Sequence, residues 1–210
     1  MEWVLTFVVS LAVLAISVVL HEMAHGVVAY WLGDDTAKEA GRFSLNPLKH
    51  IDPVMSIAVP VAMFLMGGPI FGGAKPVPIN TRNLRFREWG MALVAIAGPL
   101  TNFILAFIGV AVIQFFPLGE FGVNIALTFV YINLGFFVFN LIPIPPLDGS
   151  RVLFAVSPEF LKEILMRIEQ YGMMVMIVLV VIFGGALSNF LITAVNGIIT
   201  MFVWILGGQI

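Results

Sequence analysis

The sequence predicts an all-α polytopic membrane protein, and three observations support this. Of its 210 residues, 60% are hydrophobic and only 10% are charged, and the mean hydropathy is +1.07. A soluble domain is nearer half apolar and a quarter charged, so this chain lacks the polar side chains that would cover a surface in water. Several uncharged stretches reach the roughly 20 residues that a helix needs to cross a bilayer. The composition excludes a soluble enzyme and a disordered chain, and the net charge of −2 argues against a nucleic-acid partner.

Uncharged windows place the predicted membrane segments along the chain. They cover residues 3–20, 54–71, 89–119, 121–147 and 170–210. The first window continues as an apolar pattern to Gly33, whose residue type favours a helix end. The last window is long enough for two helices, with a break near residues 184–189. Before it, Ser157-Pro158-Glu159 predicts the start of an amphipathic helix at the membrane interface.

Basic residues gather in three loops, and their positions bear on the topology. They follow the first, second and fourth windows: Lys38, Arg42 and Lys49; Lys75, Arg82, Arg85 and Arg87; Arg151, Lys162 and Arg167. The positive-inside rule places all three loops in the cytoplasm. That requires residues 54–71 to enter and leave on one side as a re-entrant segment, which Pro60 and the glycines there allow. We therefore expect five transmembrane helices plus a re-entrant segment, or six if that segment spans. They form one domain over residues 1–210, with a core over 1–150 and accessory helices over 158–210.

A metal-binding motif lies inside the first membrane helix. His21-Glu22-Met23-Ala24-His25 is an H-E-x-x-H sequence, and residues four apart share one face of a helix, so both imidazoles can reach a single ion. Glu22 can then act as general base on a water at that ion. The alternative is a chance match, with both histidines hydrogen-bonded inside the bundle. Ionisable groups inside a membrane helix cost about 3 kcal/mol each, however, and seldom persist without a role.

A catalytic zinc needs a third protein ligand, and we expect an acid because the chain has no cysteine. Asp148 is the candidate. It follows the fourth window directly, after a proline-rich stretch that cannot form a regular helix and can bend the side chain toward the metal. The alternative for Asp148 is a surface position in a turn before Gly149. Helix direction provides a check: His21 and Asp148 reach one ion only if their segments run the same way. A single full crossing between them, residues 89–119, gives that arrangement.

The motifs and their order resemble the site-2 protease family of intramembrane zinc metalloproteases. The resemblance rests on the H-E-x-x-H motif and on Asn140-x-x-Pro143-x-Pro145-x-Leu147-Asp148-Gly149, which is similar to the family's N-x-x-P-x-P-x-L-D-G signature. Residues 46–53, 73–77 and 97–102 are also similar to family elements, and together the matches span positions 21 to 149. Because many members carry a PDZ domain or a CBS pair, for which this chain has no room, we expect a compact subgroup without them.

The resemblance implies a ligand set and the roles of individual residues. It implies one zinc ion per chain, bound by His21, His25 and Asp148, with Glu22 activating water. It also implies that Asn140 holds the substrate or stabilises the oxyanion. A hydrogen bond between helices is the alternative for Asn140, since asparagine often joins membrane helices in this way.

The implied activity is hydrolysis of peptide bonds within or near a transmembrane segment of another membrane protein. Asn102 and His50 are further candidates for groups behind the ligands or beside the substrate. The implied location is the plasma membrane of a prokaryote, with the zinc site toward the cytoplasmic side. We expect residues 72–83 to form a small β-hairpin or edge strand near the site, on which an unwound substrate could pair. An inert connecting loop is the alternative for those residues.

Two other functions compete with this interpretation. Membrane zinc proteases that trim prenylated proteins take a glutamate from a later helix as third ligand, and the sequence has no intramembrane glutamate after Glu22. A membrane metal transporter, or a scaffold stabilised by metal, is the alternative without protease activity. A transporter would place several ligand sites along a pathway, and one tight cluster argues against it.

Overall fold

The computed structural model describes residues 2–53 and 75–208, and within them the chain is helical with no strand. Four helices there are long and apolar enough to cross a membrane: α1 (Glu2–Trp31), α4 (Glu88–Phe115), α5 (Glu120–Asn140) and α8 (Gly172–Ile205). The shorter helices are α2 (Thr36–Glu39), the 3₁₀ helix η1 (Pro47–His50), α6 (Asp148–Val156) and α7 (Glu159–Glu169). The described part therefore agrees with the predicted class, an all-α protein that passes the membrane several times.

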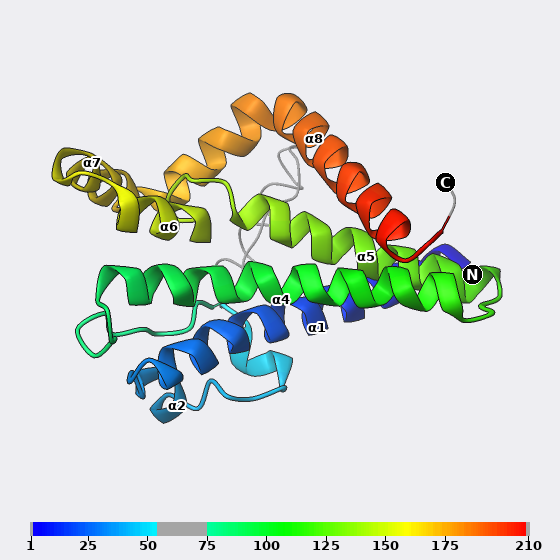
Figure 1. The fold of residues 1–210 in the computed structure, drawn as a ribbon, viewed down its shortest axis with the longest axis horizontal. Coiled ribbons are helices and arrows are strands. Elements are labelled where there is room, and N and C mark those ends of the chain that lie inside the picture. Colours follow the sequence, from blue (N-terminus) through cyan, green and yellow to red (C-terminus); the bar gives the residue numbers. More distant parts are fainter. Residues whose placement is uncertain (1, 54–74, 209–210) are drawn as a thin grey trace.

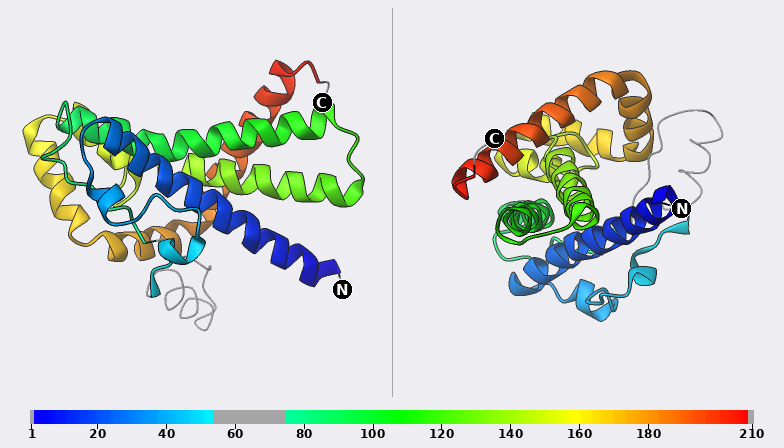
Figure 2. Two further views of the ribbon diagram at one scale, coloured as in Figure 1. Left: turned by 90° about the horizontal axis from the view of Figure 1, so that it is seen from below. Right: turned by 90° about the vertical axis from the view of Figure 1, so that its right-hand side faces the viewer.

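Helices α1, α4 and α5 form the centre of the molecule (Figure 1). Helix α4 runs opposite to α1 and α5, which run in the same direction, as the shared metal site requires. Helix α4 packs closely because most of its buried residues are small, which is typical of helix contacts in membranes. A Cβ on Gly109 would lie 2.7 Å from Cγ2 of Val130, so glycine is needed where α4 touches α5. Toward its N-terminus, α1 diverges from α4 (Figure 2).

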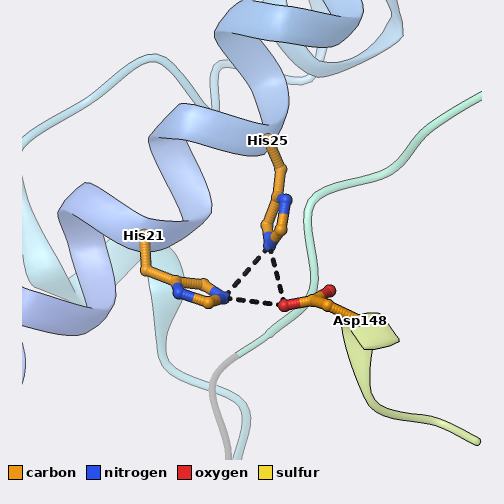
Figure 3. A group of neighbouring side chains, drawn as sticks. All are labelled: His21, His25 and Asp148. Carbon is orange, nitrogen blue, oxygen red and sulfur yellow. Dashed lines mark hydrogen bonds and ion pairs between the residues drawn. The ribbon is translucent and has the colours of Figure 1, made fainter. Parts of the chain in front are cut away.

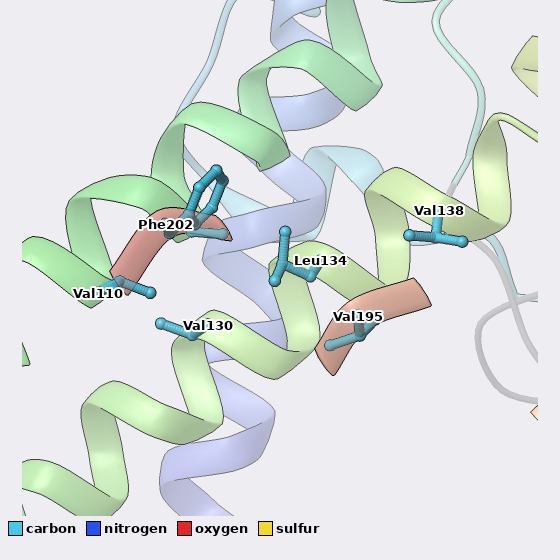
Figure 4. Close-up of a cluster of buried hydrophobic side chains, with 7 residues drawn as sticks. Val110, Val130, Leu134, Val138, Val195 and Phe202 are labelled. Carbon is cyan, nitrogen blue, oxygen red and sulfur yellow. The ribbon is translucent and has the colours of Figure 1, made fainter. Parts of the chain in front are cut away.

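A hydrophobic core joins α4, α5 and α8 (Figure 4). Its largest buried side chain is Phe202 of α8, whose ring centroid lies 4.9 Å from that of Phe103 and 5.0 Å from that of Phe107. Leu134 and Val130 of α5 complete the contact and are fully buried. Edge-to-face packing of this kind fixes the C-terminal part of α8 against α4.

The predicted break within residues 170–210 is wrong. Helix α8 is continuous from Gly172 to Ile205, and Figure 1 shows that it bends instead of ending. A glycine pair weakens a helix, but ending it would leave backbone N–H and C=O groups unpaired, which is costly in apolar surroundings. The described residues therefore contain four candidate membrane helices where the sequence predicted five.

The predicted re-entrant segment, residues 54–71, lies outside the described residues. The residues that flank it are close together, because the backbone N–H of Lys75 donates to the carbonyl of His50 at 2.8 Å. The predicted edge strand over 72–83 is not formed by its described part, residues 75–83. The amphipathic helix predicted after Ser157 is present as α7, which begins at Glu159 directly after Pro158.

Candidate metal centre

Two histidines of α1 and one aspartate of α6 meet inside the bundle (Figure 3). His21 and His25 lie one turn apart on the same face of α1, each only 7% exposed, and their Nε2 atoms are 3.0 Å apart. Oδ2 of Asp148 lies 3.2 Å from Nε2 of His21 and 3.5 Å from Nε2 of His25. The spacing of the motif and the predicted partner thus come together at one point.

The turn between α5 and α6 carries Asp148 back to α1. Helix α5 ends at Asn140, and the prolines of residues 141–147 prevent its continuation. A Cβ on Gly149 would lie 2.3 Å from the carbonyl oxygen of Leu141, so only glycine allows the chain to fold back this closely. Asp148 is the first residue of α6 and follows directly on the non-helical proline-rich stretch. The helix start points the carboxylate into the bundle, and a surface position for Asp148 is excluded.

The outer ring nitrogens of both histidines are held by hydrogen-bond acceptors. Nδ1 of His25 lies 2.7 Å from the carbonyl oxygen of Val94, and a carbonyl can only accept, so this nitrogen carries the proton. Nδ1 of His21 lies 2.6 Å from Oδ1 of Asn102. With Nδ1 protonated in both neutral rings, each Nε2 is left with a free lone pair.

The orientation of Asn102 follows from a chain of hydrogen bonds that ends on α5. Nδ2 of Asn133 donates to the carbonyl of Phe129 at 2.9 Å and to Oγ of Ser17 at 2.9 Å. Oδ1 of Asn133 must therefore accept from Nδ2 of Asn102, at 2.8 Å. This leaves Oδ1 of Asn102 as the atom that accepts the proton of His21. Since all of these side chains are buried, the network fixes both the tautomer and the direction of the ring.

The resulting donor set fits a divalent metal ion. When both rings are neutral, two imidazole lone pairs and one carboxylate oxygen face one another, and Oδ2 of Asp148 is buried without a hydrogen-bond donor among the described residues. Ligand atoms around a tetrahedral zinc ion lie about 3.4 Å apart, close to the three separations given above. A Cβ on Gly98 would lie 2.5 Å from Nε2 of His25 and 2.6 Å from Nε2 of His21, so this glycine of α4 keeps the space between the ligands open.

Glu22 lies beside the ligands in a half-buried position on α1. Its Oε2 accepts a hydrogen bond from the backbone N–H of Val77 at 3.1 Å. The segment that follows the undescribed residues therefore passes directly over the predicted general base. Asp34 holds the same segment a little further on, because its carboxylate accepts from the N–H of Asn80 at 2.6 Å and from Nδ2 of Asn83 at 3.1 Å.

The remaining predicted residues have different positions. Asn102 directly supports a ligand, as described above. The printed hydrogen bond of Asn140 is local: its Nδ2 donates to the carbonyl of Phe136 in the preceding turn of α5 at 3.1 Å. His50 is buried, its Nε2 contacts the carbonyl of Ser44 at 2.9 Å, and its Nδ1 has no partner in the part of the chain that the structure describes. The described contacts thus bring Asn102 to the three ligands and leave Asn140 and His50 apart from them.

Three residues near the centre escaped the sequence analysis. Ser17 and Asn133 take part in the network behind His21, and Gly98 faces both Nε2 atoms. Ser17 lies one helical turn before His21, and Asn133 is a strongly polar residue inside a membrane window. A search for polar side chains within the apolar segments would have found both. Gly98 lies within residues 97–102, which are similar to a family element, but the resemblance assigned it no role.

Comparisons with known proteins identify zinc metalloproteases as relatives of this chain. The family described as Peptidase family M50 matches residues 119–183. YwhC of Bacillus subtilis, described as a candidate zinc metalloprotease, is 39% identical over 179 residues, which cover 80% of this chain and 78% of YwhC. Rip2 of Mycolicibacterium smegmatis, described in the same way, is 30% identical over 185 residues, covering 86% of this chain and 70% of Rip2. The zinc metalloprotease MJ0392 of Methanocaldococcus jannaschii is 29% identical over 154 residues, covering 73% of this chain and 34% of that protein. No solved structure matches.

Proposed function

The chain belongs to peptidase family M50, the site-2 protease family of zinc metalloproteases, and on this premise we propose how its residues carry out intramembrane proteolysis. The substrate is a peptide bond within or near a transmembrane segment of another membrane protein. The observation that carries this function is the meeting of His21, His25 and Asp148, whose three ligand atoms face one another inside the bundle. A divalent cation between these atoms would neutralise the buried carboxylate and satisfy both imidazole lone pairs.

Nε2 of both histidines and the carboxylate of Asp148 would hold one zinc ion per chain. Zinc bound there would supply an acidified water and polarise a substrate carbonyl. Glu22 takes the proton of the attacking water and passes it to the leaving amine. The contact from the N–H of Val77 fixes one oxygen of Glu22 and leaves the other free for that transfer.

The other predicted residues assist the bound peptide. Asn140 has one N–H on Phe136, and its second N–H and its Oδ1 remain to hold the substrate or to stabilise the oxyanion. The segment of residues 75–83 runs beside Glu22, and an unwound substrate could pair with its backbone by β-augmentation.

The protein lies in the plasma membrane of a prokaryote with the zinc site toward the cytoplasm. The loop before α4 and the helices α6 and α7 carry most of the basic residues and lie on the side where α1 ends (Figure 1), and cytoplasmic loops carry such an excess of lysine and arginine. His21 lies ten residues before the end of α1 at Trp31, which corresponds to about 15 Å along a helix. The centre is therefore inside the hydrocarbon region, at the depth of a substrate's transmembrane segment.

The test compares metal content with cleavage in purified variants. We expect Glu22→Gln to keep one zinc ion per chain and to lose cleavage of single-span membrane proteins, because glutamine cannot take the proton. His21→Ala and Asp148→Ala are expected to lose the zinc ion itself. Cleavage by Glu22→Gln at the normal rate would refute the hydrolase mechanism. Zinc uptake by Glu22→Gln vesicles together with no proteolysis by the wild type would favour the metal transporter instead.

A further inference from the structure

An arginine-rich loop, residues 81–89, joins the segment beside Glu22 to helix α4. Its side chains Arg82, Arg85 and Arg87 are exposed, and none of the described residues forms an ion pair with them. The single carboxylate of the loop, Glu88, is already paired with Nζ of Lys162 at 2.6 Å. The loop therefore presents three positive charges that nothing in the described part of the protein neutralises.

The loop lies at the level where the membrane helices end. The backbone N–H of Arg85 donates to the carbonyl of Leu32 at 2.8 Å, next to Trp31, the last residue of α1. Trp31 is 70% exposed, and on the α4 side Phe86 and Trp89 are 69% and 58% exposed. Exposed aromatic residues at helix ends are typical of the headgroup level of a bilayer. The arginines are thus bracketed by aromatic side chains at the depth where lipid phosphates lie.

The backbone of the loop is held in a strained shape that turns these side chains outward. Phe86 and Arg87 have φ angles of 65° and 48°, in the left-handed region that residues other than glycine rarely adopt. Leu84 anchors the loop by packing, almost fully buried, against Ala29 and Val94. Strain of this kind persists only where the surroundings enforce it, and it is common at binding sites.

We propose that the arginine-rich loop binds the phosphate groups of anionic phospholipids in the adjoining leaflet. Guanidinium groups form paired hydrogen bonds with phosphate oxygens, and the flanking Phe86 and Trp89 rest in the headgroup region. An acidic segment of a protein would also complement the charge, but the exposed aromatic residues at the helix ends favour lipid.

Lipid binding also acts on the active site. The loop continues the segment that Asp34 fastens through Asn80 and that contacts Glu22 through Val77. A loop anchored on phosphates keeps this segment in place over the general base, so cleavage depends on anionic lipid. This consequence for cleavage, unlike lipid binding itself, rests on the proposed function.

Lipid binding is tested on the full chain in neutral detergent. Dioleoylphosphatidylglycerol or dioleoylphosphatidylcholine is added, and the lipid retained per chain is counted by native mass spectrometry. We expect the wild type to retain phosphatidylglycerol in preference to phosphatidylcholine. Each basic residue near a membrane surface contributes about fivefold in affinity, so the variant R82Q/R85Q/R87Q should bind phosphatidylglycerol on the order of 100-fold more weakly. Equal retention of both lipids by the wild type would overturn the proposal.

The matched control is R167Q, which removes an exposed arginine on α7 that has no ion pair among the described residues. We expect R167Q to keep the lipid preference, and the triple variant to keep its zinc content, which shows that it folds. If R167Q loses as much affinity for phosphatidylglycerol as the triple variant, general surface charge causes the binding and the loop is not a lipid site.

Cleavage in vesicles with and without phosphatidylglycerol separates the two levels of the proposal. The wild type should cleave faster with phosphatidylglycerol, and the triple variant should cleave at the same slow rate in both. A cleavage rate that depends on acidic residues of the substrate and is indifferent to lipid would overturn the consequence for cleavage, and together with equal retention of both lipids it would assign the loop to a protein partner. Lipid preference without cleavage in any vesicle would support the lipid site and refute the proposed function.

Discussion

Replacing Gly98 by alanine should remove the metal ion without unfolding the protein. The added Cβ would lie 2.5 and 2.6 Å from the Nε2 atoms of His25 and His21. Non-bonded heavy atoms prefer about 3.5 Å, so the rings would have to retreat by about 1 Å. They cannot retreat intact, because their Nδ1 atoms are held at 2.6 Å by Asn102 and at 2.7 Å by Val94. The methyl group therefore occupies the place of the ion or breaks the bonds that aim its ligands.

We expect Gly98→Ala to lower the zinc affinity strongly and to change the stability of the metal-free fold only slightly. Loss of one group that orients a ligand costs about 10- to 100-fold in metal affinity, and Gly98→Ala displaces two ligands together, so we expect at least a 100-fold loss. Inside a helix, alanine is favoured over glycine by about 1 kcal/mol, which offsets part of the strain in the metal-free protein. Zinc per chain is measured by mass spectrometry of the metal, its affinity by competition with a chelator, and unfolding by circular dichroism in the presence of chelator.

Gly135→Ala is the matched control, because it makes the same change inside α5 at a position where an added Cβ meets nothing within 4 Å. We expect it to keep zinc and activity. If Gly98→Ala binds one zinc ion per chain with the affinity of the wild type, the ion does not lie between the three ligands and the reasoning fails.

Three further predictions concern the groups around the centre. Asn102→Ala should weaken zinc binding about 10- to 100-fold, measured by chelator competition, because Nδ1 of His21 loses its acceptor; unchanged affinity would contradict the role of the network. Val77→Pro should lower kcat about tenfold at unchanged zinc content, because it removes the N–H that donates to Oε2 of Glu22. Val77→Ala keeps this N–H and should keep the rate. Equal rates for the two variants would show that the contact has no function. For Asp34, burial raises the pKa, but hydrogen bonds from Thr36, Asn80 and Asn83 outweigh it and hold the pKa below its ordinary value. Its carboxylate therefore stabilises the fold above the ordinary pKa of about 3.9, and this stability is lost as the pH falls through the lower folded value. Between pH 7 and pH 3, the melting temperature of Asp34→Asn should fall less than that of the wild type. An identical pH dependence of the two proteins would refute this role of Asp34.

The parts of the fold that the sequence predicted are those governed by local chemistry. The charge-free window located α4 to within a few residues, and the first window located α1 once its apolar continuation to Gly33 was included. The window for α5 ran too far, because α5 ends at Asn140, where the proline-rich stretch begins. The H-E-x-x-H spacing placed His21 and His25 on one face, and the direction of the windows placed Asp148 opposite them. The predicted helix break at residues 184–189 was wrong because it also relied on local residue type. Glycine often ends a helix in water, whereas a helix in lipid keeps its backbone hydrogen bonds and bends.

What the sequence could not provide are contacts between distant segments. The pairing of Asn102 with Asn133 joins residues 31 positions apart, and the contact of Val77 with Glu22 joins residues 55 apart. Each residue type has many possible partners, and only the packing of α4 between α1 and the later elements selects one. The approach of Gly98 to both rings is likewise a matter of helix separation, which no single helix determines.

The positions of two of the three ligands depend on helix α5, so the geometry of the centre depends on how the whole bundle is packed. Through the carbonyl of Phe129 and Asn133 this helix fixes the ring of His21, and through the turn that follows Asn140 it carries Asp148. His25 depends instead on the carbonyl of Val94 in α4. A shift of α5 against α1 would move Asp148 and would also displace Asn133, which orients the amide of Asn102 behind His21, whereas the acceptor of His25 in α4 would stay in place. The three ligands therefore converge only when all three helices are correctly packed, so a peptide bond can be attacked only in a fully assembled protein.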